Sequence, residues 1–149
     1  MEPLEITVSG FVAAAGADMD LREDVWALAL DQRAFGPRRL VVAFADASGR
    51  TRSLAHASKP DPPELALGPC IAHLGQGAAA AVAFCDEPVT EGPMPIHNTF
   101  RFHWARAIAA DAGVHLVDWI ACDDRLFRSA RLALEPDAEW WDVPGALDS

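Results

Sequence analysis

Three consecutive side chains that can bind a metal ion, those of Cys85, Asp86 and Glu87, follow an apolar run in this chain. A hydrolytic zinc site needs three protein ligands and a fourth position left open for water. The Cys85 thiolate, the Glu87 carboxylate and the His97 imidazole form one conceivable ligand set. Asp86 or Glu91 could then act as the general base that activates the water. A histidine in a loop is more often only solvated, so this spacing alone leaves both interpretations open.

A strand, a loop and a helix are predicted around these side chains. The apolar run at 79–85 predicts a strand that is buried on both faces. The segment 88–95 is rich in proline and glycine, which interrupt regular pairing, and it predicts a loop. Asn98 predicts the start of a helix over 98–112, because its side-chain oxygen can accept amide hydrogens of the first turn. Gly113 supplies the left-handed residue that ends this helix.

Apolar spacing along the chain predicts the remaining elements and the core. On the helix over 98–112, the spacing i, i+4, i+7, i+8 predicts a core-facing side made of Phe100, Trp104, Ala107 and Ile108. Apolar runs predict strands at 25–30, 40–45, 51–55, 114–121 and 126–134. A further helix over 64–76 is expected to start near Pro69 or to be kinked there, because proline removes a helical hydrogen bond. Strands mixed with two helices, some in β-α-β order, predict an α/β or α+β fold with a mixed β-sheet flanked by helices.

This layout resembles the JAB/MPN metalloprotease-like fold in its bacterial RadC-type form, which has a cytidine deaminase-like type of architecture. In that family the strand ends in His-x-His-Pro and an Asp opens the next helix. The resemblance places Cys85 and Glu87 at the two histidine positions and keeps Pro88. It places Asn98 at the Asp position, and it continues without a gap to about residue 129. Three further positions fall in register with the family, namely Gly113, Asp118 and Ser129. The resemblance implies that Asp118 braces the loop of the site.

The resemblance implies that the family's metal chemistry has been lost from this chain. A neutral amide at Asn98 is a poor zinc ligand, and the segment 38–42, matched to the water-activating Glu, contains no acid. Joint replacement at Cys85, Glu87 and Asn98 therefore predicts a pseudoenzyme without a cofactor. Such a non-catalytic domain would bind a protein partner or a second copy of itself.

Two other functions stay open at this point. The first alternative is a zinc metallohydrolase with the altered ligands Cys85, Glu87 and His97, which would cleave a peptide or isopeptide bond. The second is a small-molecule pocket in the vacated site, with the loop 88–95 as its wall. Nothing in the sequence names a ligand for that pocket.

Length, net charge, the longest apolar run and the number of cysteines exclude several classes of protein. A chain of 149 residues suits one domain, and a formal net charge of −10 argues against a nucleic-acid surface and against an anionic membrane face. No apolar run approaches the roughly 20 residues of a membrane span. An odd number of cysteines, three, with no secretory leader, predicts a cytoplasmic protein in a reducing compartment.

The C-terminal residues differ in character from the rest of the chain. We expect a single JAB/MPN-like domain over 1–134, followed by an acidic, tryptophan-containing tail over 135–149. Trp140 and Trp141 are adjacent in this tail, and tryptophan is enriched at binding hot spots. The pair can pack on its own domain, bind a partner or form a homodimer contact.

Overall fold

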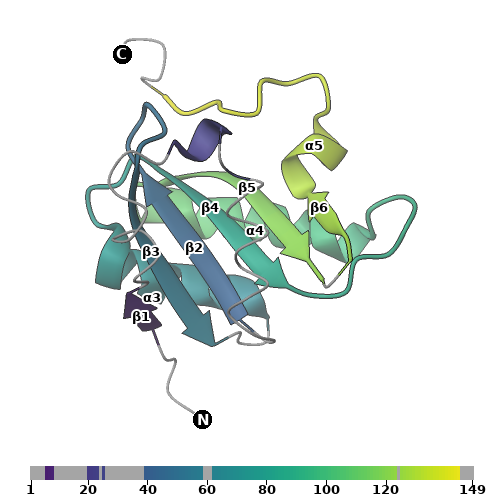
Figure 1. Ribbon diagram of the computed structural model, residues 1–149, viewed down its shortest axis with the longest axis horizontal. Helices are drawn as coiled ribbons and strands as arrows, with labels where there is room; N and C mark the ends of the chain where they lie inside the picture. Colours follow the sequence, from purple (N-terminus) through teal and green to yellow (C-terminus); the bar gives the residue numbers. More distant parts are fainter. Residues whose placement is uncertain are drawn as a thin grey trace.

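A mixed sheet with helices packed on it forms the body of the protein (Figure 1). The computed structural model describes residues 6–8, 20–23, 25, 39–58, 62–123 and 125–144. The strands in these ranges are β1 (Ile6–Val8), β2 (Arg39–Ala45), β3 (Thr51–Ser58), β4 (Ala80–Asp86), β5 (His115–Cys122) and β6 (Phe127–Ser129). The helical elements are η2 (Pro63–Ala66), α3 (Leu67–Cys70), η3 (Ile71–Gly75), α4 (Ile96–Asp111) and α5 (Ala130–Leu134). The predicted mixture of α and β structure, with a mixed sheet flanked by helices, is confirmed.

The strand order of the sheet is β1-β3-β2-β4-β5-β6. β4 and β5 run parallel, and the other paired strands are antiparallel. Parallel neighbours need a crossover connection, and the loop after β4 together with α4 supplies it. β4 lies inside the sheet, which explains why its sequence is a continuous apolar run rather than an alternating one. The strand that carries the candidate site is therefore fixed on both sides by neighbours.

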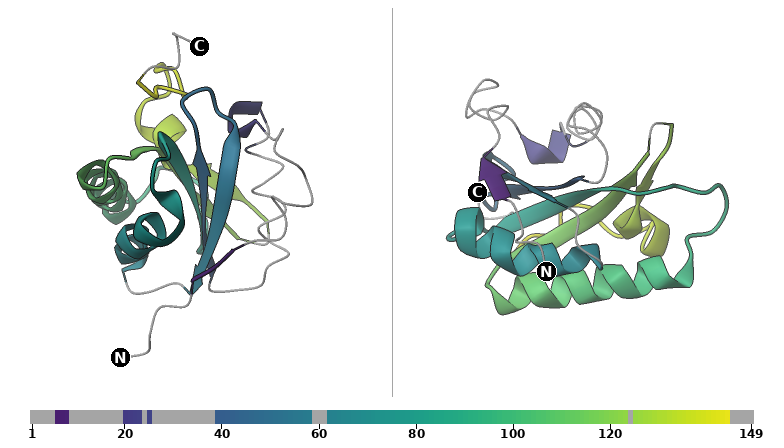
Figure 2. Two further views of the ribbon diagram at one scale, coloured as in Figure 1. Left: turned by 90° about the vertical axis from the view of Figure 1, so that its left-hand side faces the viewer. Right: turned by 90° about the horizontal axis from the view of Figure 1, so that it is seen from below.

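Two apolar layers cover the two faces of the sheet. Figure 2 shows α3 and α4 on one face and the helical turn at 21–23 on the other. Because successive strand side chains point to opposite faces, Leu40 packs in the layer beneath the helices and Val41 in the opposite layer. Both layers are built around large side chains that are fully buried, among them Phe44 and Phe84.

A β-bulge in β5 orients a residue of the candidate site. Leu116 lies opposite Ala81 and Asp118 lies opposite Val82, so β5 contains one residue more than β4 over this stretch. The extra residue changes the alternation of side chains. Leu116 and Trp119, three positions apart, consequently both pack in the layer beneath the helices.

Several predicted elements have different boundaries in the structure. The helix expected over 64–76 is a succession of three short segments, η2, α3 and η3; helical structure begins at Pro63, so the start expected near Pro69 is wrong. The strand expected over 126–134 continues as a strand only to Ser129, whose side chain accepts a hydrogen bond from Leu132 N and caps α5. Of the strand expected over 25–30, Val25 is helical instead, and residues 26–30 lie outside the described residues.

The prediction for the core-facing side of α4 is wrong for Phe100, Trp104 and Ala107, which are exposed, whereas Ile108 packs against the core as expected. The helix begins at Ile96 with Pro95 as its N-cap, so Asn98 lies in the first turn rather than at the cap. Its buried residues are Phe102, Ala105 and Ala109. Phe100 and Trp104 are 59% and 64% exposed. Both sets have helical spacing, but two alanines let α4 approach the sheet closely, and the larger side chains are left outside.

The segment predicted as a tail packs against the domain. Trp141 is 7% exposed, and its Nε1 donates to the carbonyl of Ala47 over 2.8 Å. The indole of Trp140 donates to the carboxylate of Asp118, also over 2.8 Å. Asp142 forms an ion pair with Arg131 at 2.9 Å. Residues 140–143 thus pack against the domain, although the domain was expected to end at residue 134.

Candidate functional site

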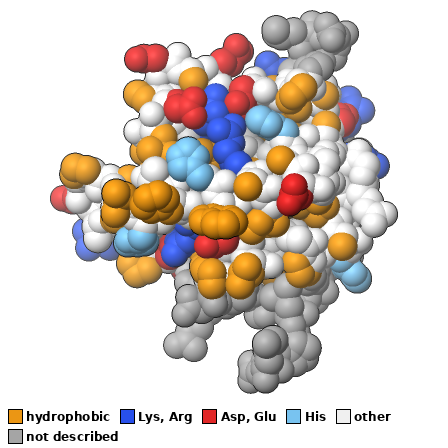
Figure 3. All heavy atoms as spheres, turned by 180° about the vertical axis from the view of Figure 1, so that it is seen from behind, with side chains coloured by type: hydrophobic (Ala, Val, Ile, Leu, Met, Phe, Trp, Pro, Cys, Tyr) orange, Lys and Arg blue, Asp and Glu red, His pale blue; other side chains and the backbone are white. Residues whose placement is uncertain are grey.

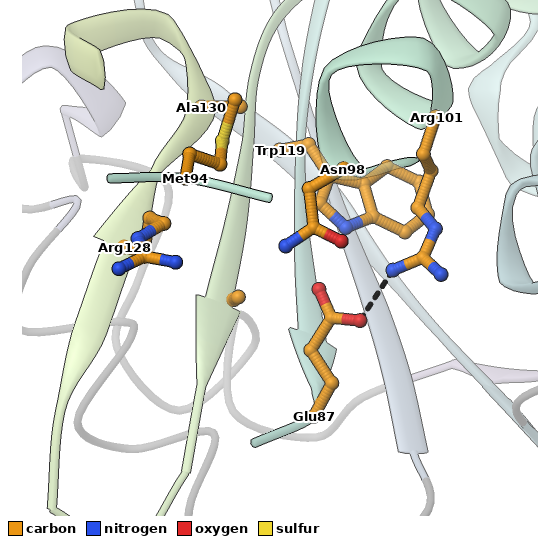
Figure 4. Close-up of a pocket in the computed structure, with 8 residues that line it drawn as sticks. Glu87, Met94, Asn98, Arg101, Trp119, Arg128 and Ala130 are labelled. Carbon is orange, nitrogen blue, oxygen red and sulfur yellow. Dashed lines mark hydrogen bonds and ion pairs between the residues drawn. The ribbon is translucent and has the colours of Figure 1, made fainter. Parts of the chain in front are cut away.

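The candidate site lies where β4 leaves the sheet and α4 begins. Here the structure has a small hollow that is partly open to solvent and encloses room for about one water molecule (Figure 4). Its lining comes from the loop after β4, from α4, from β5 and from the β6–α5 segment. The lining residues are Glu87, Met94, Asn98, Arg101, Trp119, Ala121, Arg128 and Ala130.

Two of the three positions matched to the family's metal ligands meet at this hollow. Glu87 and Asn98 both line it, from the loop and from the first turn of α4. Cys85 is the third, and its fully buried side chain packs instead in the core beneath the helices. Alternation puts Cys85 and Glu87 on the same side of the sheet, but Cys85 is packed inside β4, whereas Glu87 follows the last residue of the strand and reaches the hollow.

Arg101 supplies the positive charge closest to Glu87. Its Nη1 forms an ion pair with Glu87 Oε2, and its Nε lies 3.5 Å from Glu64 Oε2 (Figure 4 draws the contact with Glu87). A guanidinium is thereby held between two largely buried carboxylates. Arg101 is one turn after Asn98, so the spacing i, i+3 puts both side chains on the same side of α4.

These residues do not fit the zinc site implied by the family resemblance. A divalent cation beside Glu87 would also lie beside the Arg101 guanidinium, and like charges repel strongly at such distances in a low-dielectric environment. The alternative ligand set is not assembled either, since His97 is exposed while Cys85 is buried. No group of three or more His, Cys, Asp or Glu side chains suitable for a metal ion occurs in the described part of the chain. Glu91, considered above as a general base, is exposed in the loop.

We therefore expect protein purified without a histidine tag to contain well under one zinc ion per chain. The Glu87 carboxylate is already paired with the Arg101 guanidinium, so it is not free to bind zinc. The Cys85 thiol faces the core and cannot join it as a ligand. Elemental mass spectrometry would measure this, with a Cys85→Ala/Glu87→Ala variant as control. One zinc per chain in the parent protein, lost in the variant, would contradict the expectation.

Two polar atoms at the hollow lack a hydrogen-bond partner. They are Nε1 of Trp119, on a residue that is only 3% exposed, and Oδ1 of Asn98. Figure 4 shows the indole nitrogen of Trp119 facing the same space as the Asn98 amide. Buried indole N–H groups usually find an acceptor. The hollow therefore presents one unused donor and one unused acceptor.

A second guanidinium lies across the hollow from Arg101. Nη2 of Arg128 donates to the carbonyl of Gly92 at 2.9 Å and to that of Thr90. Both carbonyls belong to the loop that follows β4, and this loop is also anchored by Val89 N, which donates to Asp123 Oδ2 over 2.9 Å. The guanidinium is thus fixed at the rim by backbone contacts.

Sequence reasoning missed Arg101, Arg128 and Trp119 as members of the site. The spacing of Asn98 and Arg101 on one helix was a signal that could have found the first of them. Trp119 belongs to the strand expected over 114–121, and it is buried, but its indole nitrogen faces the hollow. The place of Arg128 at the hollow depends on how β6 lies beside the loop, which is a tertiary property.

The outward side of α4 forms a second surface of interest. Ile96, Phe100 and Trp104 follow one another at intervals of four residues, and they are 72%, 59% and 64% exposed. Figure 3 views this side of the molecule and shows hydrophobic side chains gathered on it. The arginines of α4 lie elsewhere, since Arg101 pairs with Glu87 and Arg106 with Asp142. We refer to Ile96, Phe100 and Trp104 as the α4 stripe.

Comparisons with protein-family models, curated proteins and solved structures gave no match to this chain. Among the helices that the structure describes, none combines the length and the apolar character needed to cross a membrane.

Proposed function

We propose that this chain is a non-catalytic JAB/MPN-like domain of the RadC-like type, and that it acts as a protein-binding or self-association scaffold. The order of strand, loop, helix and parallel strand around Glu87 and Asn98 supports the family assignment. The contact of Arg101 with Glu87 supports a structural rather than a metal-binding use of that carboxylate.

The observation that carries the protein-binding part is the α4 stripe. Large exposed apolar patches on soluble domains mark interaction sites, and single scattered apolar residues do not. Three large side chains spaced i, i+4, i+8 lie along one line of the helix, the pattern by which a helix docks into a groove of a partner. Tryptophan at such a position is a frequent hot spot.

Charge also favours this surface as the contact. The chain carries a formal net charge of −10, so most of its surface repels another acidic protein. The three side chains of the α4 stripe are uncharged, and the residues between them include His97 and His103 but no carboxylate. Two acidic partners can meet here with little like-charge repulsion.

We expect the double substitution Phe100→Ser/Trp104→Ser to weaken association at least about a hundredfold, because hot-spot truncations cost about 2 kcal/mol or more each. Sedimentation equilibrium would measure self-association over a range of concentrations. For a heterologous partner, a photo-crosslinking residue placed at position 104 in the native cell should give one discrete adduct.

Two controls accompany this experiment. Leu132→Ser removes an exposed apolar side chain from α5, and a photo-crosslinker at Gln76 samples an exposed turn. Neither should change association or produce the adduct. If the double variant associates and crosslinks as the parent does, the α4 stripe is not the contact and the proposal fails.

A further inference from the structure

We propose that the α4 stripe binds a second copy of this chain, with the two α4 helices packed antiparallel about a twofold axis at Phe100. This inference rests on the proposed function, since it names the partner of the α4 stripe. It depends on the symmetry of the stripe, on the sizes of its side chains and on the charges beside it.

The α4 stripe is symmetric about Phe100. Ile96 lies four residues before Phe100 and Trp104 lies four residues after it, so the three side chains form one ridge along the helix. A twofold contact uses the same patch on both copies, and this patch must therefore complement itself. When ridges of this spacing interdigitate, the two helix axes cross at about 50°, which is the commonest packing of helices in globular proteins. Phe100 then meets Phe100 of the second copy on the axis.

The sizes of the outer two side chains favour the antiparallel direction. In an antiparallel pair, Ile96 lies against Trp104 of the second copy at both ends of the contact, so a large side chain meets a smaller one each time. A parallel pair would bring the two Trp104 side chains together at one end and the two Ile96 side chains together at the other. The antiparallel pair also places the positive end of one helix dipole near the negative end of the other.

The charges on α4 favour a second copy over a basic partner. His97, His103 and Ala107 share the outward side of the helix with the α4 stripe, and all three are exposed. The first carboxylate on this side belongs to Asp111, the last residue of α4. A basic protein would find no acid on α4 to pair with at the stripe. A second copy, which also has a formal net charge of −10, meets a part of the helix without negative charge.

The length of α4 limits the strength of the contact. A helix of 16 residues is about 24 Å long, and each copy contributes three large side chains. A stable interface of standard size buries about 800 Å² on each partner and uses about 20 to 30 residues a side. Because α4 alone offers fewer residues, we expect a weak dimer with a dissociation constant of roughly 10 to 500 µM.

The twofold axis also determines which histidines meet. Because the axis crosses the ridge at a right angle, each flank of the ridge faces the same flank of the second copy. His97 therefore lies beside His97 of the second copy, and His103 lies beside His103. In a parallel pair, His97 would instead lie beside His103 of the second copy. Charges placed at these two positions distinguish the two arrangements.

The test uses two reciprocal variants of the full chain, His97→Glu/His103→Lys and His97→Lys/His103→Glu. Each adds one negative and one positive charge, so the formal net charge stays at −10. Each variant alone opposes like charges on both flanks of the antiparallel pair, whereas an equal mixture of the two opposes unlike charges. Both positions are exposed, and circular dichroism verifies that the variants fold as the parent does.

Sedimentation equilibrium at low ionic strength, over concentrations that span the expected dissociation constant, should show the parent in equilibrium between monomer and dimer. We expect each variant alone to associate at least about fivefold more weakly than the parent, because like charges that face each other are destabilising. The equal mixture should associate at least about tenfold more tightly than either variant alone. High salt should reduce both differences, since it screens exposed charges.

The outcomes separate this inference from the proposed function. A parent chain that stays monomeric over the whole range would overturn the inference, while photo-crosslinking at position 104 would still decide the proposed function. Dimers that persist unchanged in Phe100→Ser/Trp104→Ser would overturn both. Dimers that need the α4 stripe but form equally well from each charge variant alone and from the mixture would overturn the antiparallel arrangement only. Tighter association of each variant alone than of the mixture would show a parallel pair and would overturn it as well.

Discussion

Replacement of Asp118 by alanine should lower the free energy of unfolding by about 3 to 5 kcal/mol, a large fraction of the total stability of a domain. The Asp118 carboxylate is fully buried and accepts four hydrogen bonds. The donors are Trp119 N at 2.7 Å, Arg131 N at 2.9 Å, Trp140 Nε1 at 2.8 Å and the hydroxyl of Ser129. Alanine would leave these donors buried without an acceptor, and each such loss is costly.

The protonation of Asp118 gives the effect a pH dependence. Burial raises the pKa of this carboxyl above its ordinary value of 3.8, and the four donors lower it by less than burial raises it. The folded chain therefore binds this proton more tightly than the unfolded chain does. The contribution of Asp118 to stability is accordingly largest below pH 3.8 and falls as the pH rises through the pKa of the folded state. Asp118→Ala should remove this part of the pH dependence.

Urea unfolding followed by circular dichroism would measure the change. Asp111→Ala is the matched control, because Asp111 is an exposed aspartate at the end of α4 and its loss should change stability by no more than about 0.5 kcal/mol. Ser129→Ala removes only one of the four donors and should fall between the two. An Asp118→Ala variant as stable as Asp111→Ala would show that the four contacts contribute little.

Asp118 also illustrates what a resemblance can and cannot predict. Its position was matched to the family, and it was expected to brace the loop of the site. In the structure its partners belong to the start of α5 and to the C-terminal segment, so what it braces is the junction of β5 with those elements. A register match located an important residue, while its contacts depended on the chain beyond the matched region.

The strands of the sheet centre were the most predictable elements. β2 and β4 are buried on both faces, so nearly every residue in them is apolar, and short apolar runs between turns are typical of such strands. The loop after β4 followed from its prolines and glycines. These features are local, and burial by neighbouring strands only reinforces them.

The side of α4 that faces the core could not be read from the sequence. Phe102, Ala105 and Ala109 have the same helical spacing as Phe100 and Trp104, and a hydrophobicity argument favours the larger set. The choice between the two depends on how closely the helix can approach the sheet, which is a tertiary property. The same holds for the hollow, where Arg128 reaches carbonyls of the preceding loop that lie 36 and 38 residues earlier.

The C-terminal boundary of the domain, like the core-facing side of α4 and the lining of the hollow, depended on tertiary contacts. An acidic, proline-containing segment is typical of a tail, and nothing local indicates that Asp142 meets the side chains of Arg106, His115 and Arg131. Burial raises the pKa of Asp142, but the contacts with His115, Arg131 and Arg106 lower it more, so the net pKa lies below 3.8. A carboxylate whose pKa is depressed on folding stabilises the fold above pH 3.8 and loses that contribution as the pH falls.

Trp141→Ala should therefore destabilise the whole domain, by about 3 to 5 kcal/mol, the usual cost of truncating a buried aromatic residue. The indole of Trp141 packs in the layer opposite the helices and donates to the carbonyl of Ala47, which follows β2. Removing it leaves a cavity against the sheet and one carbonyl without its donor. Urea unfolding should show a lower midpoint with an unchanged slope, because the surface exposed on unfolding stays nearly the same.

Trp104→Ala is the matched control for this measurement, since it removes the same side chain from a position that is 64% exposed. Its effect on stability should stay within about 0.5 kcal/mol. If both substitutions cost equally little, residues 140–143 are only an appendage and the domain ends near residue 134, as the sequence first indicated. A large loss for Trp141→Ala alone would make the C-terminal segment an integral layer of the fold, because the outer face of β2 and β4 would then need this segment to be covered.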